Sequence, residues 1–93
     1  MIEDSTVIRR NPRTAFRELS GDQGAVLLHL DTAAYHSMNE IGTAIWNLLS
    51  QERTFAELVE ELRTELATEP PSLTEDLEQF LRGLEERDLI QFG

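Results

Sequence analysis

The chain offers few combinations of side chains that could carry out catalysis or hold a metal ion. His29 and Asp31 form an H-x-D pair, and residues two apart in a strand share a face, but two ligands make no metal site without a third. His36 is the other histidine, and the 93 residues include no cysteine. No Ser-His-Asp or Cys-His arrangement, glycine-rich nucleotide fingerprint or P-loop is present. We therefore expect no catalytic residues, cofactor or metal, with His29 and Asp31 as surface residues of a hairpin.

The formal net charge of −10 is concentrated in the C-terminal part of the chain. Residues 1–38 hold four Arg against five acids, whereas residues 39–93 hold four Arg against thirteen. This charge disfavours nucleic acids and anionic membranes, whose protein partners supply Lys and Arg. It favours basic or neutral partners, or serves only to keep a small domain soluble. Because no apolar run reaches the roughly 20 residues of a membrane span and no signal peptide opens the chain, we expect a cytoplasmic protein.

Residues 24–49 contain the elements around which the remaining segments are organised. Two runs of β-favouring residues, 24–30 and 34–38, are separated by a turn that Asp31 opens. Residues 14–19 alternate in polarity as a further strand. The short connections predict an antiparallel three-stranded sheet with the first and third of these strands at its edges.

Three helices are expected after the sheet. The first covers about 40–50, with Asn39 as its N-cap. The second opens with a capping box at Thr54, and the third, covering about 73–88, opens with another at Ser72. In each case a Glu follows three residues later, so that hydroxyl and carboxylate each satisfy a free N–H group.

This order of elements predicts a single α+β domain over residues 1–93. The arrangement is winged helix-turn-helix-like, with a three-stranded antiparallel sheet followed by three helices. We expect residues 1–8 to be flexible, although Val7 and Ile8 could add a short strand. The apolar tail that begins at Leu89 is expected to pack back on the core.

A winged-helix architecture suggests DNA binding as one hypothesis, with the third helix as the recognition helix. Between Ser72 and Asp88 that helix carries six acids and two arginines, so it would repel phosphates. A structural subunit whose sheet edge is closed by dimerisation is another hypothesis. Salt-dependent DNA binding would support the first, and sedimentation with and without peptide would test the second.

Peptide binding is the third hypothesis, because strand 34–38 carries no Lys, Pro or net charge to protect its edge. Its unpaired N–H and C=O groups suit an extended peptide. We expect the third helix to supply the other wall of a groove, through a strip of Asp76, Phe80, Gly83 and Arg87, which fall within about 60° of one another. Gly83 costs roughly 1 kcal/mol there relative to Ala, which either a close-approaching peptide or a contact inside the fold would explain.

The predicted peptide-binding residues come from the edge strand and the third helix. They are Ala34, Tyr35, His36, Ser37 and Met38 on the strand, and Asp76, Leu77, Phe80, Gly83, Leu84 and Arg87 on the helix. Tyr35 and Met38 are three apart, so one can face the core while the other meets a partner. Phe80 borders a leucine stripe and is also a core candidate. Asp76 is expected to bind a basic or hydroxyl-bearing residue of the peptide.

In sequence the chain resembles the PqqD-like proteins, the recognition domains of pathways that modify ribosomally made peptides, over about residues 9–92. The matching elements are Val26-Leu27-Leu28, Tyr-x-x-Met-Asn from Tyr35, Gly-x-x-Ile-Trp-x-x-Leu from Gly42, a helix opened by Thr54, Asp-x-x-x-Phe-Leu-x-x-Leu from Asp76, and Leu89-Ile90. Their order and spacing carry the resemblance. Two departures are Ala34 and Asp88, where many relatives have Gly.

The resemblance implies a non-catalytic protein that binds the leader of a precursor peptide by strand addition and delivers it to a processing enzyme. The Tyr-x-x-Met-Asn and Ile-Trp elements are most similar to standalone members of lasso-peptide pathways, whose partner is a leader peptidase. The branch that serves pyrroloquinoline quinone synthesis pairs instead with a radical SAM enzyme, and this alternative stays open. The implied partners are the leader peptide and the enzyme, with a homodimer as a further alternative.

Overall fold

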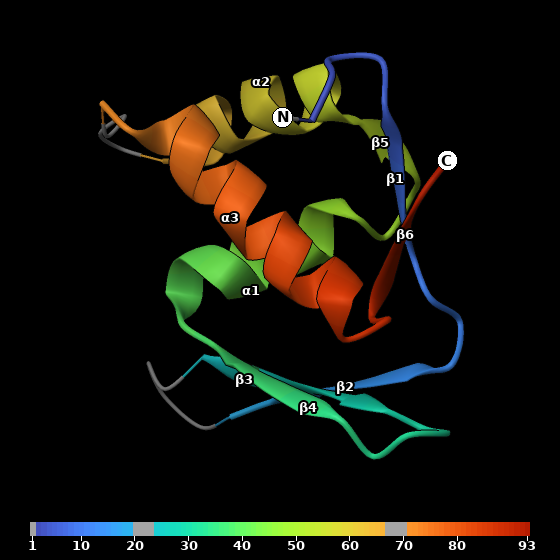
Figure 1. Ribbon diagram of the computed structural model, residues 1–93. Coiled ribbons are helices and arrows are strands. Elements are labelled where there is room, and N and C mark those ends of the chain that lie inside the picture. The colour runs from blue at the N-terminus through green and yellow to red at the C-terminus, as the bar shows by residue number, and fades with distance from the viewer. Residues whose placement is uncertain (1, 20–23, 67–70) are drawn as a thin grey trace.

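The computed structural model describes residues 2–19, 24–66 and 71–93 and has an α+β fold (Figure 1). Its main sheet consists of β2 (Thr14–Glu18), β3 (Ala25–His29) and β4 (Tyr35–Met38), paired antiparallel in the order β2-β3-β4. The predicted meander is therefore confirmed. β4 lies at one edge of this sheet, and no strand of the described ranges pairs with its outer side.

A second small sheet joins the two ends of the chain. β1 (Val7–Arg10) lies between β5 (Arg53–Thr54) and β6 (Ile90–Phe92), with both pairs antiparallel. The expectation that residues 1–8 are flexible is wrong for the part described, because Ile2 and Ile8 are buried in the core. Both chain ends are thereby held in a sheet that does not involve β4.

The three helices are α1 (Glu40–Leu48), α2 (Phe55–Glu65) and α3 (Leu73–Glu86). Asn39 caps α1, since its side-chain oxygen accepts a bond from the Gly42 N–H at 2.9 Å. The capping box at Thr54 is present at the start of α2, with both of its hydrogen bonds formed.

The capping box predicted at Ser72 is wrong. The backbone of Ser72 has φ −98° and ψ 18°, which is not the extended conformation that directs a cap side chain toward the first free N–H groups. Its hydroxyl donates instead to the carboxylate of Asp76, at 2.8 Å. Asp76 lies in the first turn of α3, so this bond holds its side chain at the beginning of the helix.

The core lies between the inner face of the main sheet and the three helices (Figure 1). The helices contribute most of it, through Ile45, Trp46, Leu49, Phe55, Leu58, Leu62, Leu73, Leu77, Leu81 and Leu84. Arg10 lies over the Trp46 ring at 4.5 Å, and its guanidinium donates to the Trp46 carbonyl oxygen at 2.6 Å. The second sheet is thus attached to α1, and the α+β prediction is confirmed, while the winged-helix comparison stays a prediction.

Candidate functional site

The outer edge of β4 presents backbone groups to a further strand. In the antiparallel pair of β3 with β4, His29 and Ala34 form a hydrogen-bonded pair, with the His29 N–H donating to the Ala34 oxygen at 2.8 Å. Bonded and non-bonded pairs alternate along such a ladder, so His36 bonds to β3 whereas Tyr35 and Ser37 do not. The N–H and C=O groups of Tyr35 and Ser37 therefore point away from the sheet, where a guest strand could pair with them.

The side chains of β4 alternate between the core and solvent. Met38 is 4% exposed and belongs to the core, whereas the Tyr35 side chain on the opposite face is 67% exposed. The prediction that one of these two residues faces the core and the other is free is confirmed. His36 shares the inner face with Met38 and is partly buried, because α3 passes over it.

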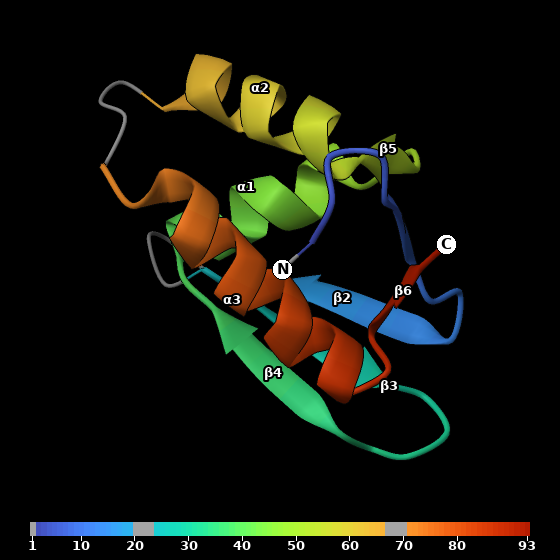
Figure 2. The same ribbon diagram turned by 45° about the horizontal axis from the view of Figure 1, so that its top comes forward.

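Helix α3 lies alongside β4 and runs in the opposite direction (Figure 2). The Phe80 ring meets the His36 ring edge to face, with centroids 5.9 Å apart. We call the outer edge of β4 and the α3 strip of Asp76, Phe80, Gly83 and Arg87 the edge site. The strip lies beside the buried stripe of α3, so a guest strand on β4 would have one row of side chains facing it.

Gly83 has open space where a side chain would be. A Cβ added there would meet only a guanidinium nitrogen of Arg87, at 3.9 Å, among the atoms of the described chain. The alternative interpretation of Gly83, a contact inside the fold, is therefore wrong. Gly42 is different, because an added Cβ would lie 3.0 Å from the Phe80 ring and 3.1 Å from the Met38 side chain. Gly42 serves the packing of α1 against the edge site, while Gly83 keeps the helix surface bare.

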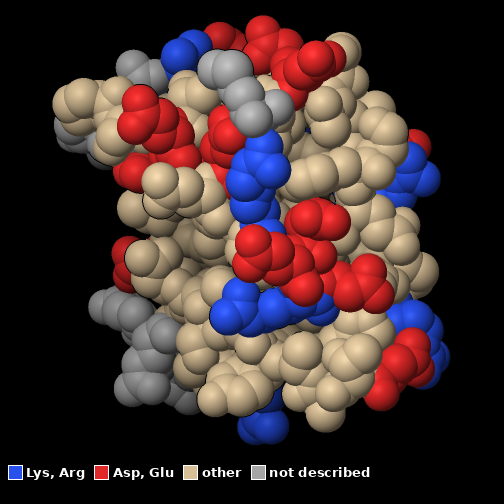
Figure 3. All heavy atoms as spheres, viewed as in Figure 1, with Lys and Arg blue, Asp and Glu red and all other residues tan. Residues whose placement is uncertain are grey.

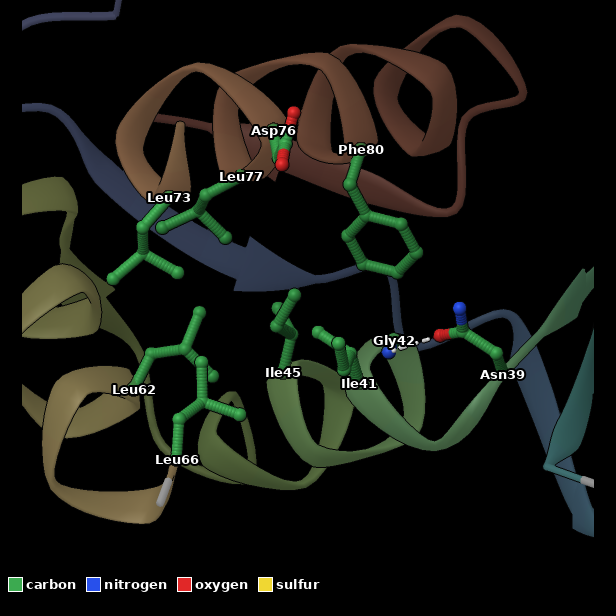
Figure 4. A pocket seen from close by; sticks show the side chains of 10 residues that line it. All are labelled: Asn39, Ile41, Gly42, Ile45, Leu62, Leu66, Leu73, Asp76, Leu77 and Phe80. Carbon is green, nitrogen blue, oxygen red and sulfur yellow. Dashed lines mark hydrogen bonds between the residues drawn. The ribbon is translucent and has the colours of Figure 1, made fainter. Parts of the chain in front are cut away.

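An apolar cavity of about 240 Å³ lies next to the edge site, between the three helices (Figure 4). Its lining consists of Asn39, Ile41, Gly42, Ile45, Leu62, Leu66, Leu73, Asp76, Leu77 and Phe80. Phe80 belongs to both the cavity and the edge site, so the two are continuous. Ile41 belongs to the apolar stripe of α1 but is 45% exposed, so the cavity has an apolar side that is open to solvent. The cavity is suited to an apolar side chain of a guest.

The predicted site residues are brought together except for Ala34 and Leu84. Ala34 precedes β4, and its oxygen is already bonded to β3. Leu84 is fully buried, and Leu77 is buried but reaches the inner wall of the cavity. Sequence reasoning missed the cavity residues of α1 and α2, and the apolar stripe of α1, which begins at Ile41, was the only local signal for them.

His29 is not a surface residue, which corrects the sequence-based expectation. It is 3% exposed, and its Nδ1 accepts from the backbone N–H groups of Asp31 and Thr32 at 3.1 and 3.3 Å. The ring proton therefore resides on Nε2, which donates to the Asp88 carboxylate at 3.0 Å. The described residues contain no group of three or more His, Cys, Asp or Glu that could hold a metal ion.

Asp88 takes the place of glycine at the end of α3. Its φ of +58° is left-handed, and the Leu89 N–H donates to the Leu84 oxygen at 2.9 Å, which is the bond of a Schellman motif. Asp pays a conformational cost there, but its side chain is bonded to His29 on β3. This contact links the C-terminal end of α3 to the main sheet.

Acidic and basic side chains lie close together on the face of the molecule that α3 occupies, among a larger uncharged surface (Figure 3). Arg82 pairs with Glu78 at 3.3 Å, on a side of α3 away from β4. Burial lowers the pKa of His36, and the positive charge of Arg87 lowers it further. His36 therefore favours its neutral form within the edge site. No helix of the described residues is long and apolar enough to cross a membrane.

Comparison with protein families gives one match. The model of the family described as Coenzyme PQQ synthesis protein D (PqqD) matches residues 24–90, which include the main-sheet strands β3 and β4 and all three helices. No curated protein sequence matches the chain.

Three solved structures have the same fold. TbiB1 in complex with the TbiA(beta) leader peptide is 29% identical, with a TM-score of 0.74 over 89% of this chain and 94% of that chain. A lasso peptide synthetase B1 complexed with the leader peptide is 22% identical, with a TM-score of 0.67 over 90% of this chain and 96% of that chain. The PqqD part of Methylobacterium extorquens PqqCD is described as a recognition element for ribosomally synthesized and post-translationally modified peptides (RiPPs). It is 18% identical, with a TM-score of 0.76 over 98% of this chain and 95% of that chain. The last two similarities concern the fold alone.

Proposed function

Because the chain belongs to the PqqD family, we propose that it is a non-catalytic recognition protein that binds the leader of a ribosomally made precursor peptide. The leader adds as a strand to the outer edge of β4 and lies against α3. The observation that carries this proposal is the unpaired edge of β4 beside the bare surface of Gly83. The similarity to TbiB1, whose structure contains a leader peptide, supports it.

Binding has a general part and a selective part. Backbone bonds to Tyr35 and Ser37 supply affinity for any extended chain. The strip on α3 and the neighbouring cavity select among the leader side chains that face inward. Phe80 lines the cavity and contacts His36 of β4, so an apolar leader side chain in the cavity would lie against its ring. Asp76 lies at the cavity rim and is placed to accept from a basic or hydroxyl-bearing residue of the leader.

We further propose that the loaded protein delivers the precursor to the leader peptidase of a lasso-peptide pathway. The Tyr-x-x-Met-Asn element from Tyr35 and the Ile45-Trp46 pair, which resemble standalone members of lasso-peptide pathways, favour this over the alternative, a chaperone for the pyrroloquinoline quinone precursor that works with a radical SAM enzyme. The neighbouring genes distinguish the two pathways, since a short open reading frame for the precursor, together with peptidase and cyclase genes, marks a lasso pathway. A radical SAM gene in their place would favour the alternative.

The test is a binding measurement with the leader encoded beside this chain's gene. A fluorescently labelled leader should bind, and should lose affinity when Gly83 is replaced by Leu. Replacing exposed Glu85 by Leu, about 160° around α3 from Gly83, is the matched control and should leave binding unchanged. Absence of binding by the wild-type protein would contradict the proposed function. A second copy of the chain is the competing occupant of the β4 edge, so a dimer in sedimentation that persists with excess leader would also contradict it.

A further inference from the structure

Two opposite charges mark the two ends of the edge site on α3. Asp76 is on the first turn of the helix, and Arg87 is its C-cap. Eleven residues of helix separate them by about 16 Å along the axis. The Arg87 side chain folds back, since its Nη1 donates to the Gly83 oxygen at 3.1 Å, which brings its charge toward the level of Gly83. The two charges are therefore roughly 10 to 16 Å apart.

The charge of Arg87 is available to a guest. Within the described ranges, no carboxylate lies within ion-pair distance of Arg87, whereas Arg82 on another side of the same helix is paired with Glu78. Arg87 also acts on β4, because its charge contributes to the lowered pKa of His36. The guanidinium thus lies near the strand that a guest would pair with, over the bare surface of Gly83.

The direction of the helix gives the two charges an order along the guest. Since α3 and β4 run in opposite directions (Figure 2), a guest paired antiparallel to β4 runs in the same direction as α3. Antiparallel pairing is the more stable arrangement per residue. Such a guest passes Asp76 first and Arg87 afterwards.

We propose that the edge site reads a charge pattern in the leader: a basic residue on its N-terminal side and a carboxylate four residues later. A strand rises about 3.3 Å per residue, so the separation of the two charges corresponds to roughly three to five residues. Only an even spacing puts both guest side chains on the face toward α3, which selects four. This inference rests on the proposed function and adds the orientation and charge order of the leader.

The test uses two synthetic peptides of identical composition. Both are twelve-residue sequences that alternate Val and Thr, and they differ only in whether Lys precedes Glu by four residues or Glu precedes Lys. The wild-type protein should bind the Lys-first peptide about tenfold more tightly, since both ion pairs become repulsive in the other peptide. The preference should shrink in 1 M salt, where charges are screened over about 3 Å.

Charge reversal in the protein provides the matched variant. The double variant Asp76→Arg, Arg87→Asp should prefer the Glu-first peptide, while Arg82→Gln, which removes a cation from another side of α3, should keep the wild-type preference. Equal binding of the two peptides by the wild type, or a preference for Glu-first, would overturn the charge pattern. Failure of both peptides to bind would overturn it too, and binding of the encoded leader decides separately whether the proposed function stands.

Discussion

Replacing Ser37 by proline should weaken leader binding strongly while the fold survives. The register of β3 and β4 points the Ser37 N–H away from the sheet, so proline removes a donor that the main sheet does not use. The preceding residue, His36, is already in a strand, which is the conformation that proline requires of it. Proline on the outer edge of a strand is otherwise tolerated.

The expected loss has two parts. The hydrogen bond from the Ser37 N–H contributes about 1 kcal/mol net to binding, and the leader carbonyl that is then buried without a donor costs about 1 kcal/mol more. Together these amount to about 2 kcal/mol, or roughly a thirtyfold higher Kd.

Fluorescence anisotropy with the labelled leader measures the Kd, and thermal unfolding reports the fold. Ser37→Ala keeps the N–H and should bind as the wild type does. His36→Pro is the opposite control, because it removes a bond to β3 and should lower the melting temperature. A Ser37→Pro protein that melts and binds like the wild type would refute the reasoning.

Four further predictions concern single side chains. Gly83→Ala should raise the free energy of unfolding by about 1 kcal/mol, because Ala favours a helix more than Gly does and the added methyl meets open space. A urea titration in which the two proteins unfold with the same free energy would contradict this. His36 has a lowered pKa, so it binds a proton less readily in the folded protein than in the unfolded chain. The free energy of unfolding therefore carries the full contribution of neutral His36 above about pH 6.5. It declines as the pH falls below that value, by at most about 1.4 kcal/mol per pH unit. A His36→Gln protein should lack this part of the pH dependence. His29→Leu should destabilise the fold by about 2 kcal/mol in urea denaturation, since Asp88 and two turn N–H groups lose their partner; unchanged stability would argue against that network. Thr54→Ala should cost about 1 kcal/mol through loss of the α2 cap, with Thr54→Ser as the variant that retains it.

Local patterns in the sequence predicted the elements well. The three strands of the main sheet and the caps at Asn39 and Thr54 depend on neighbouring residues, and all are present. Ser72 has the same pattern as Thr54 but a backbone conformation that is not extended, and its hydroxyl bonds to Asp76 instead of a free N–H group. The capping signal therefore holds only where the chain enters the helix in an extended conformation.

Features that depend on distant residues were not predictable in the same way. The pairing of β1 with β5 and β6 joins short segments from the beginning, middle and end of the chain. Val7 and Ile8 indicated a short strand, but no local pattern indicates its partners. Buried His29 is bonded to Asp88, 59 residues away, a contact that no local pattern indicates. The strand and α3 parts of the candidate site were predicted from edge character and helical spacing, whereas the cavity depends on how three helices cross.

Amide hydrogen exchange along β4, followed by NMR with and without bound leader, tests strand addition most directly. If a leader strand pairs with the outer edge, the amides of Tyr35 and Ser37 gain protection on binding, while that of His36, already bonded to β3, changes little. Uniform protection along β4, or none at Tyr35 and Ser37 in a saturated complex, would contradict the account.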